Sequence, residues 1–308
     1  MSDFIAPTEV PAGKGSNAED GVFPRDVTHF FGTMTVQAKP QRLVVLATGQ
    51  LDQAINLGVV PVGTTINGFP DAVPSYLADK FPQHAEAIAA IKPVGARTEL
   101  DFHAIAALKP DVIVGTAAGA HGRAFNELNA IAPTFLTEGY GYNWKQDFRL
   151  FAELLGEREK ATQIMAAYHA RAARMRQRLI EAGRNGDEVS FGRNAKKGLE
   201  IYGEKAFVGT IAWDLGLARP ASQRFDAIIR QITPDQLADM DGDWLFFSEA
   251  PAMPRAQEDR AAIEATWPQL KAVRNGKTQD VLIEPWFTMV APTAASTVLD
   301  GIEAALLA

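Results

Sequence analysis

Between two glycines near the middle of the chain, residues 157–182 read EREKATQIMAAYHARAARMRQRLIEA. The run contains neither glycine nor proline and is dense in Ala, Arg, Glu and Met, which are strong helix formers. At ~1.5 Å per residue, one continuous helix over this run is about 39 Å long, enough to cross a whole domain. We therefore expect a rigid helix that joins two lobes; the alternative is a long helix on the surface of one domain.

Strand and helix patterns alternate on both sides of this run. Short apolar runs such as 43–46 suit strands that are buried on both faces. The expected strands are 43–46, 59–65, 111–115, 134–136, 188–191, 199–202, 244–247 and 281–283, with a hairpin over 27–36. The expected helices are 51–57, 101–108, 123–132, 148–155, 207–215, 234–240, 260–265 and 292–307. This alternation predicts an α/β fold with mostly parallel sheets flanked by helices.

The two halves of the chain also repeat one pattern. Asp101 begins a short helix and Asp111 begins the following strand, and Thr233 and Asp243 do the same at equal spacing. Thr233 and Gln236 form a capping box. We therefore expect a flexible leader over 1–22, an N-terminal lobe over 23–142, a linker and interdomain helix over 143–182, and a C-terminal lobe over 183–308.

Composition narrows the function. The 308 residues fit two domains at roughly 150 residues each, and 30 basic against 37 acidic side chains give a net charge of −7. This acidity argues against a nucleic-acid partner. The chain has no cysteine, which excludes disulfides and a cysteine nucleophile. No run approaches the length of a membrane span, and Met1-Ser2-Asp3 does not begin a signal peptide, so we expect a cytoplasmic protein or one cut after its export signal.

The chain carries no recognisable catalytic motif. Phosphate-binding glycine loops and a nucleophile elbow are absent, and none of the five histidines has the spacing of a metal ligand. An enzyme is therefore disfavoured, and we expect no intrinsic metal or cofactor. The alternative is a binding protein whose ligand lies between two lobes.

Arginines and aromatic residues stand where the expected strands end, in both halves. Arg97 lies in the loop 95–99, and its planar guanidinium suits oxygen ligands, although it could instead pair with Glu99. Aromatic residues at such positions are often core residues, but together with arginines they suit a large, partly apolar, oxygen-rich or anionic ligand. The aromatic and arginine positions are Tyr140, Tyr142, Trp144, Phe191, Arg193, Tyr202, Trp286 and Phe287.

In the order of its motifs, the chain resembles bacterial iron-siderophore substrate-binding proteins of ABC transporters, the class with a helical backbone that also serves haem and cobalamin. The resemblance runs from Phe23 to the C-terminus. Its most specific part is 94–99 followed by 105–111, VGARTE and IAALKPD. The segments 23–32, 42–46, 54–63, 130–134, 141–145 and 286–288 are also similar to the family.

This resemblance implies two lobes joined by the long helix, and delivery of a ferric siderophore from the cleft to a membrane permease. Arg97 lies where hydroxamate-binding members place an arginine against ligand oxygens. Arg193 and Phe191 lie where members use an arginine and an aromatic residue from the other lobe. Further pocket positions implied in this way are Trp144, Tyr202, Trp286 and Arg123. The siderophore fills the coordination sphere of iron, so no protein side chain is expected to bind the metal.

Two features depart from the family pattern. Members carry one surface glutamate per lobe, at the second residue of paired short helices, which binds permease arginines; here these positions are His103 and Asp235. Members are also commonly lipoproteins with an N-terminal cysteine, which this chain lacks. We expect a monomer outside the cytoplasm that favours hydroxamate siderophores. Alternatives are a binding protein for haem or cobalamin, and a two-lobed enzyme of nitrogenase-like or chelatase architecture.

Overall fold

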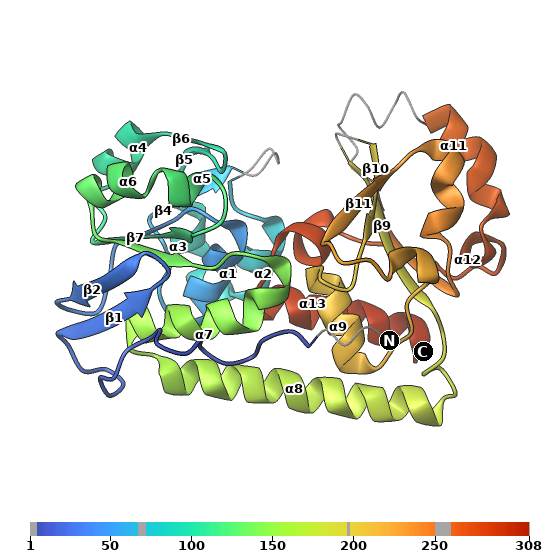
Figure 1. The fold of residues 1–308 in the computed structure, drawn as a ribbon, viewed down its shortest axis with the longest axis horizontal. Coiled ribbons are helices and arrows are strands. Elements are labelled where there is room, and N and C mark those ends of the chain that lie inside the picture. The colour runs from blue at the N-terminus through green and yellow to red at the C-terminus, as the bar shows by residue number, and fades with distance from the viewer. Residues whose placement is uncertain (1–4, 67–71, 196–197, 250–259, 308) are drawn as a thin grey trace. The chain divides into compact units, whose positions relative to one another are not determined.

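The computed structural model describes residues 5–66, 72–195, 198–249 and 260–307 (Figure 1). The chain forms two compact units. The N-terminal lobe comprises Pro7–Ala166 and Met289–Ala294, and the C-terminal lobe comprises Ala167–Thr288, Ala295–Ala308 and Met1–Ala6. Residues 143–166 therefore belong to the N-terminal lobe, beyond the 23–142 that we expected.

The N-terminal lobe is built on a sheet of six strands in the order β6-β5-β4-β3-β7-β8. All neighbours are parallel except β5 and β6, which form a tight antiparallel pair. The strands are β3 (Leu43–Val45), β4 (Gly63–Ile66), β5 (Lys92–Ala96), β6 (Glu99–Leu100), β7 (Val112–Thr116) and β8 (Thr134–Thr137). The expected parallel α/β arrangement is confirmed in this lobe.

Helices cover both faces of this sheet (Figure 1). Ile105 of α4 and Leu128 of α6 pack on Val44 and Ile113 in one core cluster, because alternate residues of a strand face the same side. The helices are α1 (Thr48–Asn56), α2 (Ser75–Lys80), η1 (Pro82–His84), α3 (Ala85–Ala89), α4 (Phe102–Ala107), α5 (Ala120–Arg123), α6 (Phe125–Ile131), η2 (Gly141–Asn143) and α7 (Trp144–Leu155). The predicted hairpin is confirmed as β1 (Arg25–His29) and β2 (Gly32–Val36), which pair antiparallel.

The C-terminal lobe is built on a sheet of five strands in the order β11-β10-β9-β12-β13. Strand β12 pairs parallel with β9 and β13, whereas β10 pairs antiparallel with β9 and β11. The strands are β9 (Val189–Ala195), β10 (Gly198–Tyr202), β11 (Ile229–Ile232), β12 (Trp244–Glu249) and β13 (Thr278–Asp280). The expected strand at 281–283 is wrong by three residues, and β11, a polar edge strand, was not expected.

The helices of this lobe largely follow the sequence pattern. They are α9 (Phe207–Leu215), η3 (Ala221–Gln223), η4 (Pro234–Met240), α11 (Arg260–Thr266), η5 (Trp267–Gln269), α12 (Lys271–Arg274), the π-helix η6 (Glu284–Thr288) and α13 (Pro292–Leu306). On one face of the sheet, Leu199, Ile201 and Leu245 pack with Leu237 of η4. Phe191 and Phe246 lie on the opposite face against Trp286.

The long central helix is confirmed as α8 (Arg158–Glu181). Gly156 and Gly183 flank it in the left-handed conformation, with φ of 65° and 68°. Its buried residues recur at steps of three or four, which gives the helix one apolar face. They are Ala161, Met165, Tyr168, Ala172, Met175 and Leu179. The division between the lobes falls inside α8, after Ala166, so one unbroken helix carries the chain from the first lobe into the second.

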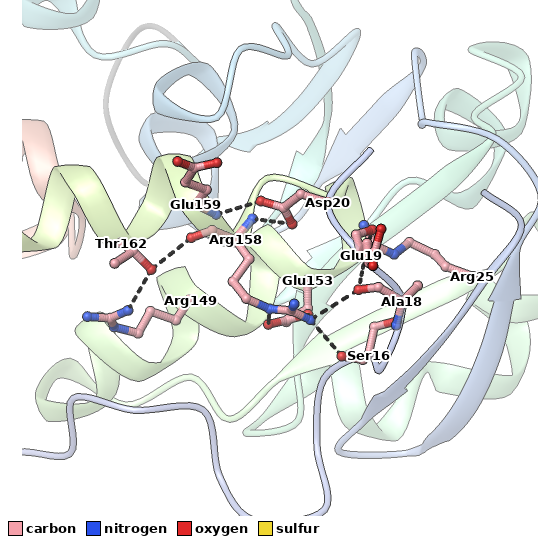
Figure 2. Close-up of polar contacts among 10 residues, drawn as sticks. All are labelled: Ser16, Ala18, Glu19, Asp20, Arg25, Arg149, Glu153, Arg158, Glu159 and Thr162. Atoms are coloured by element: carbon pink, nitrogen blue, oxygen red, sulfur yellow. Dashed lines mark hydrogen bonds and ion pairs between the residues drawn. The ribbon is translucent and has the colours of Figure 1, made fainter. Parts of the chain in front are cut away.

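The stretch that composition predicts to be a flexible leader makes specific contacts instead. Its first four residues lie outside the described residues. Gly15 and Thr28 exchange backbone hydrogen bonds of 2.8 Å in both directions. The Asp20 carboxylate accepts the backbone N–H groups of Arg158 (3.0 Å) and Glu159 (2.6 Å) at the start of α8 (Figure 2). These N–H groups have no acceptor within the helix, so Asp20 acts as its cap.

Two arginines hold the leader further (Figure 2). Arg158 binds both carboxylate oxygens of Glu153 at 2.7 Å and donates to the Ser16 carbonyl at 2.7 Å. The buried Arg25 donates to the carbonyls of Ala18 and Glu19, each at 3.1 Å. The leader is ordered because it supplies acceptors to these buried or helix-terminal donors, a role that composition does not reveal.

Asp111 and Asp243, the aspartates of the repeated sequence pattern, make equivalent hydrogen bonds in the two lobes. Asp111, before β7, accepts the backbone N–H groups of Gln41 and Arg42, before β3. Asp243, before β12, accepts the N–H of Glu188, before β9. Each aspartate therefore ties the amino ends of two neighbouring parallel strands, which fixes their register.

Asp52 of α1 is a fully buried carboxylate that receives the first turn of α13. It accepts the N–H groups of Thr293 (3.3 Å) and Ala294 (3.1 Å) and the hydroxyl of Tyr76 (2.9 Å). Burial raises the pKa of Asp52 to about 6, and these hydrogen bonds oppose the rise.

Replacing Asp20 by alanine should lower the free energy of unfolding by about 1 kcal/mol, because two N–H groups of α8 lose their acceptor. Urea denaturation at pH 7 measures this loss. Glu19→Ala is the matched control, since Glu19 takes part in these contacts through its carbonyl and not through its carboxylate. Equal stability of the Asp20 variant and the control would contradict the capping role.

The raised pKa of Asp52 predicts a pH dependence that its asparagine variant lacks. Between pH 4 and pH 6 the folded state binds more protons at Asp52 than the unfolded state, whose pKa is 3.8. This contribution to stability is present below about pH 4 and is lost as the pH rises through 6. The destabilisation caused by Asp52→Asn should therefore shrink by about 2 kcal/mol between pH 4.5 and pH 7.5, measured by urea denaturation. If Asp52→Asn lowered the free energy of unfolding equally at both pH values, the raised pKa of Asp52 would be contradicted.

Candidate functional site

The carboxyl ends of parallel strands meet at one edge of a sheet, and ligands of open α/β sheets bind at this edge. Arg97 lies there in the N-terminal lobe, in the turn between β5 and β6, and it is exposed. The backbone N–H of Arg97 donates to the Ile66 carbonyl at 3.3 Å, and this bond ties the turn to the end of β4. Gly95 makes the turn tight: its φ is 89°, and a Cβ there would lie 2.5 Å from the Asp101 nitrogen. Arg97 therefore projects from a constrained turn.

Arg123 and His121 belong to α5, which follows β7 at the same edge. Arg123 is exposed, whereas His121 is buried with its Nδ1 3.1 Å from Thr116 Oγ1. Burial, together with the charge of Arg97, lowers the pKa of His121 to about 4. The imidazole is therefore neutral at pH 7, and Arg97 and Arg123 supply positive charge at this edge.

The loop after β8 places its aromatic residues in two environments. Trp144, the first residue of α7, is completely buried, with the Lys145 ammonium 5.6 Å from its ring. Tyr140, by contrast, is 42% exposed and stacks on Tyr142 at a centroid distance of 5.6 Å. The accessible aromatic surface of this loop is thus that of the tyrosines.

In the C-terminal lobe, Arg193 and Tyr202 lie together on neighbouring strands. Arg193 Nε is 2.7 Å from Glu200 Oε2, directly opposite on β10, and its guanidinium carbon lies 5.9 Å from the Tyr202 ring. The Tyr202 hydroxyl donates to the same carboxylate at 3.3 Å, and its ring packs on Phe287 at 4.6 Å. Burial raises the pKa of Tyr202 well above its usual value, so the phenol stays protonated.

Phe191 and Trp286 continue this cluster into the core. The Phe191 ring lies 6.2 Å from the Trp286 ring, and both are buried. Four of the predicted pocket residues, Phe191, Arg193, Tyr202 and Trp286, therefore lie on one face of one sheet. Arg193 is the most accessible of them, with 17% of its side chain exposed.

The sequence analysis did not identify Arg219, which packs on the Phe191 ring of this cluster. Its guanidinium carbon lies 4.4 Å from the centre of the Phe191 ring, and it donates to Gln223 at 2.5 Å. Gln223 in turn accepts the N–H of Phe191 and donates to Ser190 on β9. Burial lowers the pKa of Arg219 to about 9, with the charge of Glu204 opposing. Arg219 follows α9 in an ordinary loop, and no spacing in the sequence connects it with Phe191.

A cavity of about 380 Å³ lies on the other side of this sheet. Its wall includes the carboxylates Glu249, Glu264 and Asp280 and the ring of Trp267. None of the predicted ligand residues lines it. Its acidic wall does not suit an anionic ligand.

The two predicted docking residues occupy matching positions. His103 is the second residue of α4 and Asp235 the second residue of η4, and both are exposed. Asp101 caps α4 by accepting the N–H of Ala104 at 2.9 Å, and Gln236 Oε1 accepts the N–H of Thr233 at 3.1 Å. The second helix, expected over 234–240, has these bounds in the structure and is a 3-10 helix.

Within the described part of the chain, no three His, Cys, Asp or Glu side chains are placed to share a metal ion, and no helix is long and apolar enough to cross a membrane. Two α/β lobes connected by α8, with arginines and aromatic residues where parallel strands end in the N-terminal lobe and on one sheet face in the C-terminal lobe, define the architecture of a two-lobed ligand-binding protein. The chain belongs to the periplasmic binding protein family, whose model matches residues 43–280.

Curated relatives agree with this assignment. The chain is 31% identical over 291 residues to the probable siderophore-binding lipoprotein YfiY of Bacillus subtilis, covering 91% of this chain and 86% of the relative. It is 25% identical to the Fe(3+) dicitrate-binding periplasmic protein FecB of Escherichia coli, covering 90% of this chain and 88% of that protein. Among solved structures, Staphylococcus aureus SirA complexed with staphyloferrin B has a TM-score of 0.79 at 23% identity, covering 92% of this chain and 98% of SirA. This similarity supports the two-lobed fold.

Proposed function

We propose that this protein captures a ferric siderophore and delivers it to an ABC importer for iron uptake. One observation carries the proposal: each lobe presents an accessible arginine, exposed Arg97 where β5 ends and partly exposed Arg193 within β9 beside Tyr202. The names of relatives that bind siderophores or ferric citrate support it. Haem or cobalamin is the alternative ligand.

The guanidinium groups would hold the oxygen atoms of the chelate. Arg193 contacts Glu200 through Nε, so its two terminal nitrogens are the donors left for a ligand oxygen. Glu200 also cancels much of the charge of Arg193, whereas Arg97 has neutral His121 as its neighbour. Arg97 would therefore make the larger electrostatic contribution. Iron would have no protein ligand, because the siderophore fills its coordination sphere.

Three finer expectations belong to the same proposal. The protein acts outside the cytoplasm, as relatives that are named periplasmic or lipoproteins do. It acts as a monomer, and it prefers hydroxamates. Relatives are named for ferric citrate, hydroxamate and petrobactin binding, so a panel of these three ligand types tests the preference.

Arg97→Ala and Arg193→Ala should each weaken binding of the ferric siderophore by about tenfold to over a hundredfold, with the larger loss for Arg97. A charge-assisted contact in a partly dry site contributes roughly 1.5–3 kcal/mol. Quenching of tryptophan fluorescence during titration measures the affinities. The control is Arg274→Ala, an exposed arginine at the end of α12, before β13 and so at the opposite edge of the sheet. Unchanged affinity in both test variants would contradict the assignment of Arg97 and Arg193 as siderophore-binding residues.

Asp235→Arg should abolish uptake of bound siderophore while leaving its affinity intact, and His103→Ala should change uptake little. A carboxylate in the first turn can accept two parallel hydrogen bonds from a permease arginine, whereas an imidazole cannot accept such a bidentate contact. Vesicles containing the reconstituted importer and loaded binding protein measure uptake. If His103→Ala abolished uptake and Asp235→Arg left it unchanged, the main docking residue would be His103 and not Asp235.

A further inference from the structure

Tyr140 and Tyr142 form a flat aromatic surface that the proposed function has not yet used. Their rings are nearly parallel, with an interplanar angle of 4°, and Tyr140 is 42% exposed. An exposed ring that stacks on a second ring presents a rigid apolar face, because its side chain has few rotamers to lose on binding. We call this pair the tyrosine shelf.

Hydrogen bonds to a buried carboxylate and within its own backbone fix the loop that carries the shelf. The buried Asp147 carboxylate accepts the N–H groups of Glu138 (3.1 Å) and Gly139 (2.8 Å), and Asn143 N–H donates to the Tyr140 carbonyl at 3.0 Å. Gly139 has a φ of 95°, and a Cβ there would lie 2.3 Å from Thr116 Cβ. The backbone on either side of Tyr140 is therefore fixed before any ligand arrives.

A short series of contacts leads from the shelf to Arg97. Gly139, next to Tyr140, packs against Thr116, and Thr116 Oγ1 is 3.1 Å from His121 Nδ1. His121 lies near enough to Arg97 for that positive charge to lower its pKa. The shelf and the exposed arginine thus belong to one edge of one sheet, with Thr116 and His121 between them.

We infer that the tyrosine shelf binds the carbon rim of the chelate, meaning its methylene linkers or aryl rings, while Arg97 holds its oxygens. The inference rests on the proposed function and specifies which part of the ligand this lobe recognises. Ferric dicitrate has only single methylene groups between polar carboxylate and hydroxyl carbons, so it offers no extended apolar rim and would gain little from the shelf. Trp144, a pocket residue that the family resemblance implied, is completely buried.

The test compares ligands with and without a rim on the full chain. The probes are a ferric trihydroxamate with methylene linkers, a ferric tris-catecholate and ferric dicitrate, titrated by isothermal calorimetry. Tyr140→Ala should weaken binding of the rim-bearing chelates about three- to tenfold, the range expected when one aromatic contact is removed, and leave ferric dicitrate unchanged. Tyr140→Phe should bind within about twofold of the unmodified protein, because it keeps the ring.

Phe102→Ala is the matched control, since Phe102 is an aromatic residue of the same lobe with 38% exposure, at the start of α4. Circular dichroism and melting temperature verify that all variants fold. Unchanged binding of rim-bearing chelates by Tyr140→Ala, an equal loss for Tyr140→Phe, or binding of ferric dicitrate alone would each overturn the inference while the proposed function stands. Failure of the unmodified protein to bind any of the three would overturn the proposed function, and the inference with it.

Discussion

Parallel strand pairing is the constraint on which the arrangement of this protein depends. In a parallel sheet every strand ends at the same edge, so residues far apart in the chain are brought together there. Arg97, Arg123 and Tyr140 follow β5, β7 and β8, and they share an edge for this reason alone. Asp111 and Asp243 secure the pairing at the opposite edge of each sheet: Asp111 accepts two backbone N–H groups, and Asp243 one, from residues just before the neighbouring strand.

Several titratable side chains of the N-terminal lobe are buried at a cost, and shifts of their pKa values toward the neutral form offset that cost. Burial raises the pKa of Asp147 to about 7 and lowers those of His29 and His121 to about 4. Each shift favours the neutral form, which removes the penalty of a buried charge. The histidines and the carboxyl groups act in opposite directions on stability, because neutral histidine favours the folded state at higher pH and a protonated carboxyl favours it at lower pH. The edge therefore keeps its charge on arginines, which do not titrate near neutrality.

Periodicity and capping signals located most of the framework. The absence of Gly and Pro from 157–182 is sufficient to predict where α8 lies. The pattern of Thr233, Pro234 and Gln236 predicts where η4 begins, but it does not predict that η4 is a 3-10 helix. The short helices α2 and α3 were not expected, because runs this short carry little periodicity. Strand β11 was missed because its residues are mostly exposed, so it lacks the alternation that reveals a half-buried strand.

The candidate site was harder to predict, for a physical reason. Sequence pattern shows that an aromatic residue follows a strand, but the packing of the whole lobe decides which ring is covered. Trp144 begins α7 and turns inward, whereas Tyr140, four residues earlier, remains at the surface. Arg219 supports Phe191 across a loop, a tertiary contact that no local pattern encodes.

The central claim is that one chain takes up one intact ferric chelate and contributes no ligand to the iron. Gel filtration followed by native mass spectrometry tests it most directly, with the protein mixed in turn with a ferric siderophore, the metal-free siderophore and ferric iron alone. The account predicts a coloured 1:1 complex whose added mass equals siderophore plus iron, and whose charge-transfer absorption band matches that of the free chelate. A protein that elutes colourless with every siderophore class, or that retains iron without the siderophore, would contradict it.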